Sequence, residues 1–281
     1  MRIDLHTHSD ASDGTCSPAD VVRAAATEGV AVLALTDHDT FAGLAEAAAQ
    51  APRSGVRLVR GVEISCTHGG ISLHLLGYQP DETDTELLEE LGRCRDLRVP
   101  RAQQMVARLV SDGLPIGWEQ VEELAAGGTV GRPHIADALV RAGAVADREE
   151  AFGRYLRPDG PYYVRHYAVD AVTAVRLVRR CGGVPVFAHP GAHTRGPTVD
   201  DAAIEELAAA GLFGLEVDHP DHDEATRAHL RDVAGVLGLQ VTGSSDFHGA
   251  GRPQRIGCET TSPDVLEALL AEAVPQPGRR S

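Results

Sequence analysis

The sequence contains no lysine and no asparagine, so all 26 basic residues among its 281 positions are arginine. Without lysine the chain can form no Schiff base with a carbonyl substrate, and it has no P-loop, whose motif requires lysine. Cysteine is scarce as well: five cysteines are widely spaced, and none of them forms a CxxC pair. An odd number in this arrangement argues against a disulfide framework and against a thiolate zinc site.

Long apolar runs are also missing. No stretch approaches the roughly 20 apolar residues that a membrane-spanning helix requires, and Met1 is followed by a charged, strand-like segment rather than by the apolar region of a signal peptide. Basic charge is in deficit, because 26 arginines against 41 acidic residues give a net charge of −15. We therefore expect a cytoplasmic globular protein with no membrane partner and no extended nucleic-acid surface.

Histidine is abundant, with thirteen residues against one tryptophan and two methionines. Short aliphatic runs alternate with helical patterns along the chain, which predicts parallel βα units. Nearly every run leads into histidine or carboxylate, and in a β/α barrel the carboxyl ends of the strands meet at one mouth. The pairs of run and polar residue are 2–5 with His6 and His8, 30–35 with His38, 56–62 with Glu63, 71–76 containing His74, 183–188 with His189, 212–217 with His219, and 239–241 with Asp246 and His248.

Seven such runs predict an α/β fold, a distorted TIM-like (β/α)7 barrel made of residues 1–79 and 169–274. Residues 80–168 carry several helical patterns without a clear strand between them. We expect this segment to be a helical insertion that caps the active site and returns His134 to it. Residues 275–281 are rich in Pro, Gly and Arg and are expected to be a disordered tail.

The residue types at the predicted mouth are those of a metal site. His6 and His8 are two positions apart at a strand end, so both side chains lie on the same face and can bind one ion. Asp13, Glu63 and Asp246 add carboxylate oxygens. Imidazole nitrogen combined with carboxylate, without thiolate, suits Mn²⁺, Fe²⁺ or Zn²⁺.

Four motifs in order, DLHTHS, LTDHD, GVEIS and SDFHG, resemble those of the PHP (polymerase and histidinol phosphatase) family. The resemblance implies a distorted seven-stranded barrel with a trinuclear site that binds two to three divalent ions. The implied ligands are His6, His8, Glu63 and Asp246 for one metal, Glu63, His74 and His134 for a second, and Asp13, His38 and His248 for a third.

The other histidines match no ligand position. We expect His68, His166 and His229 at the surface. His193, His219 and His222 should lie near the mouth, either beside the ligands or in plain loops.

Phosphate-ester hydrolysis is the reaction that this set of ligands predicts. Bound cations make the mouth locally positive although the chain is acidic, and water on a zinc-like ion, with a pKa of about 7, can attack phosphorus. We expect Glu63, as a bridge, and Asp246 to be essential for catalysis, and His189 to protonate the leaving oxygen as general acid.

Arginine suits phosphate recognition, because its planar fork matches two phosphate oxygens. Arg132, two residues before His134, is the best-placed candidate, followed by Arg101 and Arg195. Relatives often carry an Arg-Tyr pair at positions 192–193, where this chain has Ala-His. His193 and Arg195 are therefore expected to take part in substrate binding in their place.

Residues 131–136, 152–156 and 161–164 resemble the stand-alone phosphoesterases that act on nucleotides. This branch implies a nucleoside 3′,5′-bisphosphate 3′-phosphatase or a 5′-3′ exonuclease on short oligonucleotides, with a small phosphorylated nucleotide as partner. Alternatives are a histidinol-phosphate phosphatase, a phosphatase for another small cyclic or sugar phosphate, and a non-catalytic module that scaffolds a polymerase. The short chain and the intact ligand set count against the scaffold.

Overall fold

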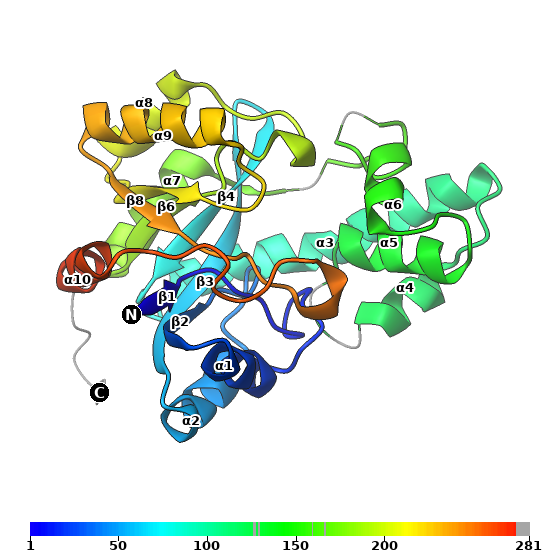
Figure 1. Cartoon of the computed structure of the whole chain (residues 1–281). Coiled ribbons are helices and arrows are strands. Elements are labelled where there is room, and N and C mark those ends of the chain that lie inside the picture. Colours follow the sequence, from blue (N-terminus) through cyan, green and yellow to red (C-terminus); the bar gives the residue numbers. More distant parts are fainter. Residues whose placement is uncertain (126–127, 129, 159, 166, 274–281) are drawn as a thin grey trace.

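A computed structural model describes residues 1–281 except 126–127, 129, 159, 166 and 274–281. The predicted α/β class is confirmed: a central sheet is covered by helices, and a second, helical lobe lies beside it (Figure 1). The strands are β1 (Arg2–Asp4), β2 (Val30–Leu35), β3 (Arg57–His68), β4 (Ile71–Tyr78), β5 (Val169–Asp170), β6 (Val184–Ala188), β7 (Gly214–Asp218) and β8 (Gln240–Gly243). The helices that cover the sheet are α1 (Pro18–Thr27), α2 (Leu44–Ser54), α7 (Ala171–Arg180), α8 (Asp201–Ala209), α9 (Glu224–Leu237) and α10 (Pro263–Glu272).

The strand order is β1-β2-β3-β4-β6-β7-β8, with β5 paired to β3. The expectation of parallel βα units holds for β1–β2–β3 and for β6–β7–β8, but it is wrong for β4. Strands β3 and β4 form a hairpin, and β4 is antiparallel to β6 as well. The hairpin arises because only Gly69 and Gly70, both with positive φ, separate the two strands.

A closed barrel is not shown. No ladder joins β1 to β8 among the described residues, and one isolated bridge, between Thr7 and Phe247, links the segments that follow them. The edges are connected by a side chain instead. The buried Asp4 carboxylate accepts hydrogen bonds from Ser245 N (3.1 Å), Ser245 Oγ (2.5 Å) and Gly257 N (2.7 Å). The sheet therefore curves until its two ends meet through Asp4.

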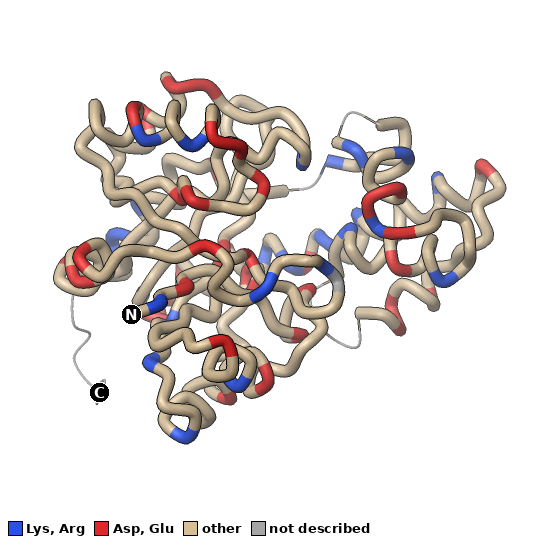
Figure 2. Tube along the Cα trace, viewed as in Figure 1, with Lys and Arg blue, Asp and Glu red and all other residues tan. Residues whose placement is uncertain are grey.

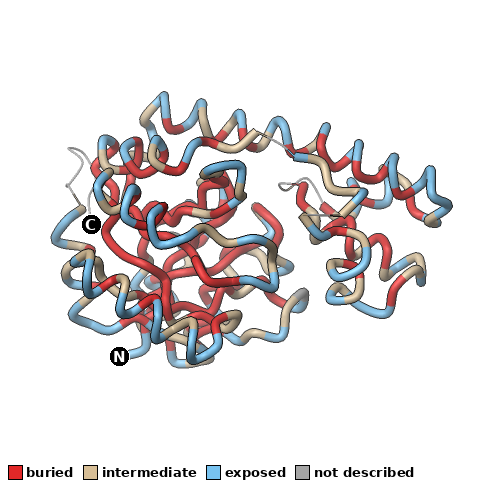
Figure 3. Tube along the Cα trace, turned by 90° about the horizontal axis from the view of Figure 1, so that it is seen from above, coloured by how far each residue is buried: buried red, intermediate tan, exposed pale blue. Residues whose placement is uncertain are grey.

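The second lobe contains α3 (Thr85–Ser111), α4 (Trp118–Ala125), α5 (Arg132–Arg141) and α6 (Arg148–Arg154). Its apolar core includes Met105, Val121 and Ile135, whereas Leu87 and Leu91 of α3 pack into the core beside the sheet. Helix α3 therefore belongs to both cores, and Figure 3 shows it running from one lobe to the other above a mostly buried sheet.

No helix in the described part of the chain combines the length and the apolar character that crossing a membrane requires. The tail predicted at 275–281 and His166 lie outside the described residues.

Candidate metal centre and substrate cavity

The first two predicted ligands leave β1 on the same side of the chain. His6 and His8 are fully buried, and their Nε2 atoms lie 3.0 Å apart. The Nε2 atom of His6 lies 3.3 Å from Glu63 Oε2 and 3.4 Å from Asp246 Oδ1, and that of His8 lies 3.1 and 3.3 Å from the same oxygens. Two imidazole nitrogens and two carboxylate oxygens therefore converge on one point.

Glu63 lies at the middle of the cluster. Its Oε2 faces His6, His8 and also His38, whose Nδ1 is 3.0 Å away. Its Oε1 faces the other way, 2.8 Å from His74 Nδ1 and 3.1 Å from His189 Nε2. One carboxylate thus contacts two separate groups of histidines, which is the geometry of a bridging ligand.

A third group gathers around Asp13. His248 Nε2 lies 3.3 Å from Asp13 Oδ1, and His38 Nε2 lies 3.8 Å from Asp13 Oδ2. The Nδ1 atom of His248 donates to the Asp246 carbonyl at 2.8 Å, which leaves its Nε2 lone pair free toward Asp13. His8, Asp13, His38 and His248 have donor atoms within 4.8 Å of one another and are all buried.

The structure brings together all the predicted ligands except His134. His134 is buried on α5, where its Nδ1 accepts a hydrogen bond from the Gly131 N–H at 3.0 Å, and it is in none of the groups of donor atoms among the described residues. His189 lies instead with His74 at Glu63 Oε1, because Ala188 pairs with His74 across β4 and β6. This placement favours a ligand role for His189 over the expected general-acid role.

The cluster is suited to divalent ions on two further observations. Buried atoms of Asp13 (Oδ1), Glu63 (Oε2), His38 and His74 (Nδ1) and His248 (Nε2) have no hydrogen-bond partner. A buried polar atom without a partner is destabilising, whereas a metal bond satisfies it. Metal–ligand bonds of about 2.0–2.2 Å place donor atoms about 3–3.5 Å apart, as seen around Glu63.

Two of the residues in the cluster have strained backbones. His189 has φ +34° and Asp246 has φ +51°, in the left-handed region that residues with a side chain rarely adopt. Such strain of about 1–3 kcal/mol persists only where the surroundings impose it, and it is concentrated at functional sites.

Three buried carboxylates that sequence reasoning missed hold the loops that carry the ligands. Asp4 anchors the segment before Asp246, as described above. Asp37 accepts from Ser9 N and Ser9 Oγ, both at 2.7 Å, and Asp39 accepts from Ser65 N at 2.7 Å. The signal available in the sequence was an acidic residue at the end of an apolar run, but the same pattern also describes the ligands themselves.

Charge around the ligands shifts their pKa values in opposite directions. Burial disfavours a charged ring, yet Asp246 and Glu63 raise the pKa of His8 to about 9. Burial, reinforced by Arg252, lowers the pKa of His248 to about 4. Burial, with Arg195 nearby, holds the pKa of His189 well below its usual value.

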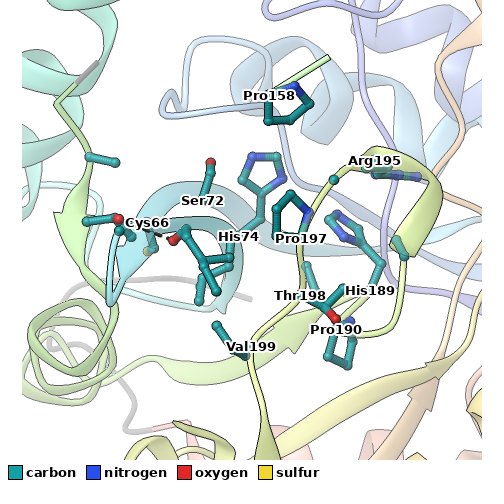
Figure 4. Close-up of a pocket in the computed structure, with 18 of the residues that line it drawn as sticks. Cys66, Ser72, His74, Pro158, His189, Pro190, Arg195, Pro197, Thr198 and Val199 are labelled. Carbon is teal, nitrogen blue, oxygen red and sulfur yellow. Dashed lines mark hydrogen bonds between the residues drawn. The ribbon is translucent and has the colours of Figure 1, made fainter. Parts of the chain in front are cut away.

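A cavity of about 440 Å³ opens beside His74 and His189. Figure 4 shows both imidazoles on one side of it, with Arg195 close to them and Pro158 across the opening. Its wall combines the β3–β4 hairpin, the 196–199 loop, and Arg132 and Tyr163 of the helical lobe. The metal ligands and the helical lobe therefore share one cavity.

The predicted substrate residues differ in their surroundings. Arg101 donates to Val164 O and Arg132 to Leu156 O, and both guanidiniums lie over the Tyr163 ring, at 5.0 and 5.6 Å. Neither forms an ion pair with a carboxylate of the described residues. Burial, together with the neighbouring Arg132, lowers the pKa of Arg101 to about 10, so it remains a cation at neutral pH.

Arg195 is already paired with carboxylates, because it donates to Asp221 at 2.7 Å and to Asp246 at 2.6 Å. His193 is exposed and does not line this cavity. Of the other histidines, His219 and His222 are buried near the cluster and His68 and His229 lie nearer the surface. Elsewhere arginines and acidic residues are interspersed over both lobes (Figure 2).

Comparison with known proteins agrees with this geometry. Residues 4–113 match the model of the PHP domain. The chain is 38% identical over 278 residues to a 3′,5′-nucleoside bisphosphate phosphatase of Chromobacterium violaceum, covering 96% of each chain. It is 35% identical to a 5′-3′ exoribonuclease of Haemophilus influenzae, covering 88% of this chain and 90% of the other.

Two further relatives extend the comparison. A phosphoribosyl 1,2-cyclic phosphate 1,2-diphosphodiesterase of Eggerthella lenta is 35% identical, with 92% of this chain and 98% of the other covered. The solved structure of a protein from Bifidobacterium adolescentis, proposed to be a metal-dependent phosphoesterase, superposes with a TM-score of 0.93 at 34% identity and covers 99% and 98% of the two chains.

Proposed function

The chain belongs to the PHP domain family of phosphoesterases, and on that premise we propose that it is a metal-dependent hydrolase that removes a phosphate from nucleoside 3′,5′-bisphosphates. The observation that carries this substrate is the pair of buried arginines, Arg101 and Arg132, which have no carboxylate partner among the described residues. In a chain with 41 acidic residues and 26 arginines, two buried cations without an acid beside a cavity indicate an anionic ligand.

The two ends of the cavity would divide the work. His74 and His189 mark the end where the reacting phosphate would lie, and Arg132, held by Leu156 O and stacked on Tyr163, marks the end for a second phosphate. A guanidinium fixed in this way can receive two phosphate oxygens with little loss of conformational freedom. A substrate with two phosphates on one nucleoside fits this arrangement better than a simple monoester does.

The metal centre would use the groups described above. We assign His6, His8, Glu63 and Asp246 to one ion, Glu63, His74 and His189 to a second, and Asp13, His38 and His248 to a third. The donor set suits Mn²⁺, Fe²⁺ or Zn²⁺, with two or three ions bound. Such ions would polarise the phosphoryl group and lower the pKa of water for attack on phosphorus.

The residues around the ligands prepare the site for this chemistry. The carboxylate of Asp246 presents Oδ1 to His6 and His8, while Arg195 and Arg252 hold its Oδ2 at 2.6 and 2.7 Å. These two arginines also add positive charge at the end of the cavity where phosphate would bind. The buried walls keep bulk water away from the ligands.

A second function is supported by one observation, the relative from Eggerthella lenta that acts on a cyclic sugar phosphate. A single cyclic phosphate would occupy the metal end and would leave Arg132 without a partner. The two functions therefore differ in their need for Arg132.

Phosphate release distinguishes these substrates. The protein, supplied with Mn²⁺, is assayed with adenosine 3′,5′-bisphosphate, a short 5′-phosphorylated oligoribonucleotide, histidinol phosphate and a 1,2-cyclic ribose phosphate. We expect the highest kcat/KM on the bisphosphate, followed by the oligonucleotide, and no turnover by Glu63→Gln on any of them. A higher kcat/KM on the cyclic phosphate or on histidinol phosphate would overturn the proposal.

A further inference from the structure

Glu216 is a fully buried carboxylate at the middle of β7 that no sequence motif pointed to. Its neighbours Leu215 and Val217 pack into the apolar core under the helices. Because side chains alternate along a strand, Glu216 points to the opposite face of the sheet, toward the ligands. An ionised side chain in this position is destabilising unless its oxygens are well paired.

Both of its oxygens contact residues of the metal centre. Glu216 Oε1 lies 2.9 Å from His6 Nδ1, and Oε2 accepts the backbone N–H of His189 at 2.8 Å. The Nε2 atoms of these histidines contact different oxygens of Glu63, Oε2 for His6 and Oε1 for His189. One carboxylate therefore supports a member of each of two ligand groups.

The contact with His6 determines which ring nitrogen is available. A carboxylate accepts hydrogen bonds and donates none, so the neutral imidazole must carry its proton on Nδ1. Its lone pair is then on Nε2, the nitrogen that faces His8, Glu63 and Asp246. Carboxylates that orient metal-binding histidines in this way strengthen metal binding.

The contact with His189 acts on the backbone. At φ +34° this residue is in a conformation that a non-glycine residue leaves readily if nothing holds it. The bond from its N–H to Glu216 Oε2, and the bond from Ala192 N to its carbonyl at 3.1 Å, fix the turn after β6. In this turn the ring of His189 faces Glu63 Oε1.

We propose that Glu216 is a positioning residue that presents His6 and His189 to two metal ions at once. The proposal rests on the proposed function only in requiring that the cluster binds metal. Removing one acceptor oxygen should therefore weaken both ions together, without removing any ligand.

The test is Glu216→Gln, which keeps the shape of the side chain but has only one acceptor oxygen for two N–H groups. Metal affinity is measured by competition with a chelator for Zn²⁺ and Mn²⁺, and ¹⁵N NMR of the zinc-loaded protein reports the proton on His6 Nδ1. We expect affinity to fall about ten- to a hundredfold, as for other carboxylates behind ligating histidines, and the His6 signal to shift or disappear.

Asp218→Asn is the matched control, because it removes a carboxylate two residues along the same strand that pairs with Arg227 and Arg231. It should bind metal as the wild type does. Should Glu216→Gln fail to fold, Glu216→Asp replaces it: both oxygens remain, but the shorter side chain cannot reach both histidines, and affinity should again fall at least about tenfold.

Wild-type affinity and an unchanged His6 signal in a folded Glu216 variant would overturn the inference while leaving the proposed function intact. Absence of metal binding by the wild type would overturn the proposed function itself. The two failures are therefore distinguishable.

Discussion

His189 can be tested directly, because a ligand and a general acid respond differently to substitution. We predict that His189→Asn lowers the metal content and slows an alkyl phosphate and p-nitrophenyl phosphate in parallel, since the histidine lies with His74 at Glu63 Oε1. Elemental analysis and kcat on both esters check this. A selective loss of about 10²- to 10⁴-fold on the alkyl ester, with metal retained, would restore the general-acid role.

Arg132 provides a test of substrate binding. Arg132→Ala should raise KM for adenosine 3′,5′-bisphosphate about ten- to a hundredfold, the loss expected for hydrogen bonds to a charged group. KM for p-nitrophenyl phosphate, which has no second phosphate, should change little. Arg176→Ala removes an exposed arginine on α7 and serves as the control. Equal losses on both substrates would place Arg132 at the reacting phosphate.

The ligands could be predicted from the sequence where they follow a strand that is parallel to its neighbours, as His6, His8, His38 and Glu63 do. The choice between His134 and His189 could not be predicted, because each is next to a proline and each follows an apolar run or opens a helix. What decides it is the antiparallel register of β4 and β6, which pairs His74 with Ala188. Glu216 was missed for a related reason: its role depends on contacts with residues 210 and 27 positions away.

At the scale of elements, the junction between α3 and the sheet depends on one buried ion pair. Arg98 donates from Nε and Nη2 to Asp39 Oδ2, at 3.0 and 2.7 Å, and also contacts Ser65 Oγ. The pair ties the helix shared by both lobes to the loop after β2. Neither its partner nor its burial could be read from the sequence, where Arg98 is one of five arginines between 93 and 108.

We predict that Arg98→Met destabilises the protein by about 3–5 kcal/mol, because it leaves the buried Asp39 carboxylate without its cation. Urea unfolding of the metal-free protein measures the difference. Arg93→Ala, on the exposed side of the same helix, should change stability by no more than about 1 kcal/mol. If the two variants were equally stable, α3 would not depend on the Arg98–Asp39 pair.

At the scale of the whole molecule, stability and metal binding should depend on pH in opposite ways. Glu63 and Asp246 raise the pKa of His8 to about 9 against the effect of burial, whereas an unfolded histidine titrates near 6.5. The stability contributed by charged His8 is complete below about pH 6.5 and is lost as pH rises through about 9. Metal binding requires the neutral ring, so affinity rises over the same range by about tenfold per pH unit for each proton released.

We therefore predict that saturating Zn²⁺ raises Tm more at pH 9 than at pH 6.5, measured by calorimetry with and without metal. His248, whose pKa burial lowers to about 4, stays neutral throughout this range and adds nothing to the difference. An equal gain in Tm at both pH values would show that His8 is already neutral in the metal-free protein.

The meeting of β1 with the segment after β8 has a consequence for synthesis of the chain. His6 and His8 leave the ribosome among the first residues, whereas Asp246, which shares their ion site, and Gly257, which fixes Asp4, emerge among the last. A nascent chain can form α1 to α9 in order, but it cannot complete the first ion site until nearly its whole length has been made. Premature termination at any codon before that for Asp246 therefore yields a polypeptide that lacks this site, however well its earlier part folds.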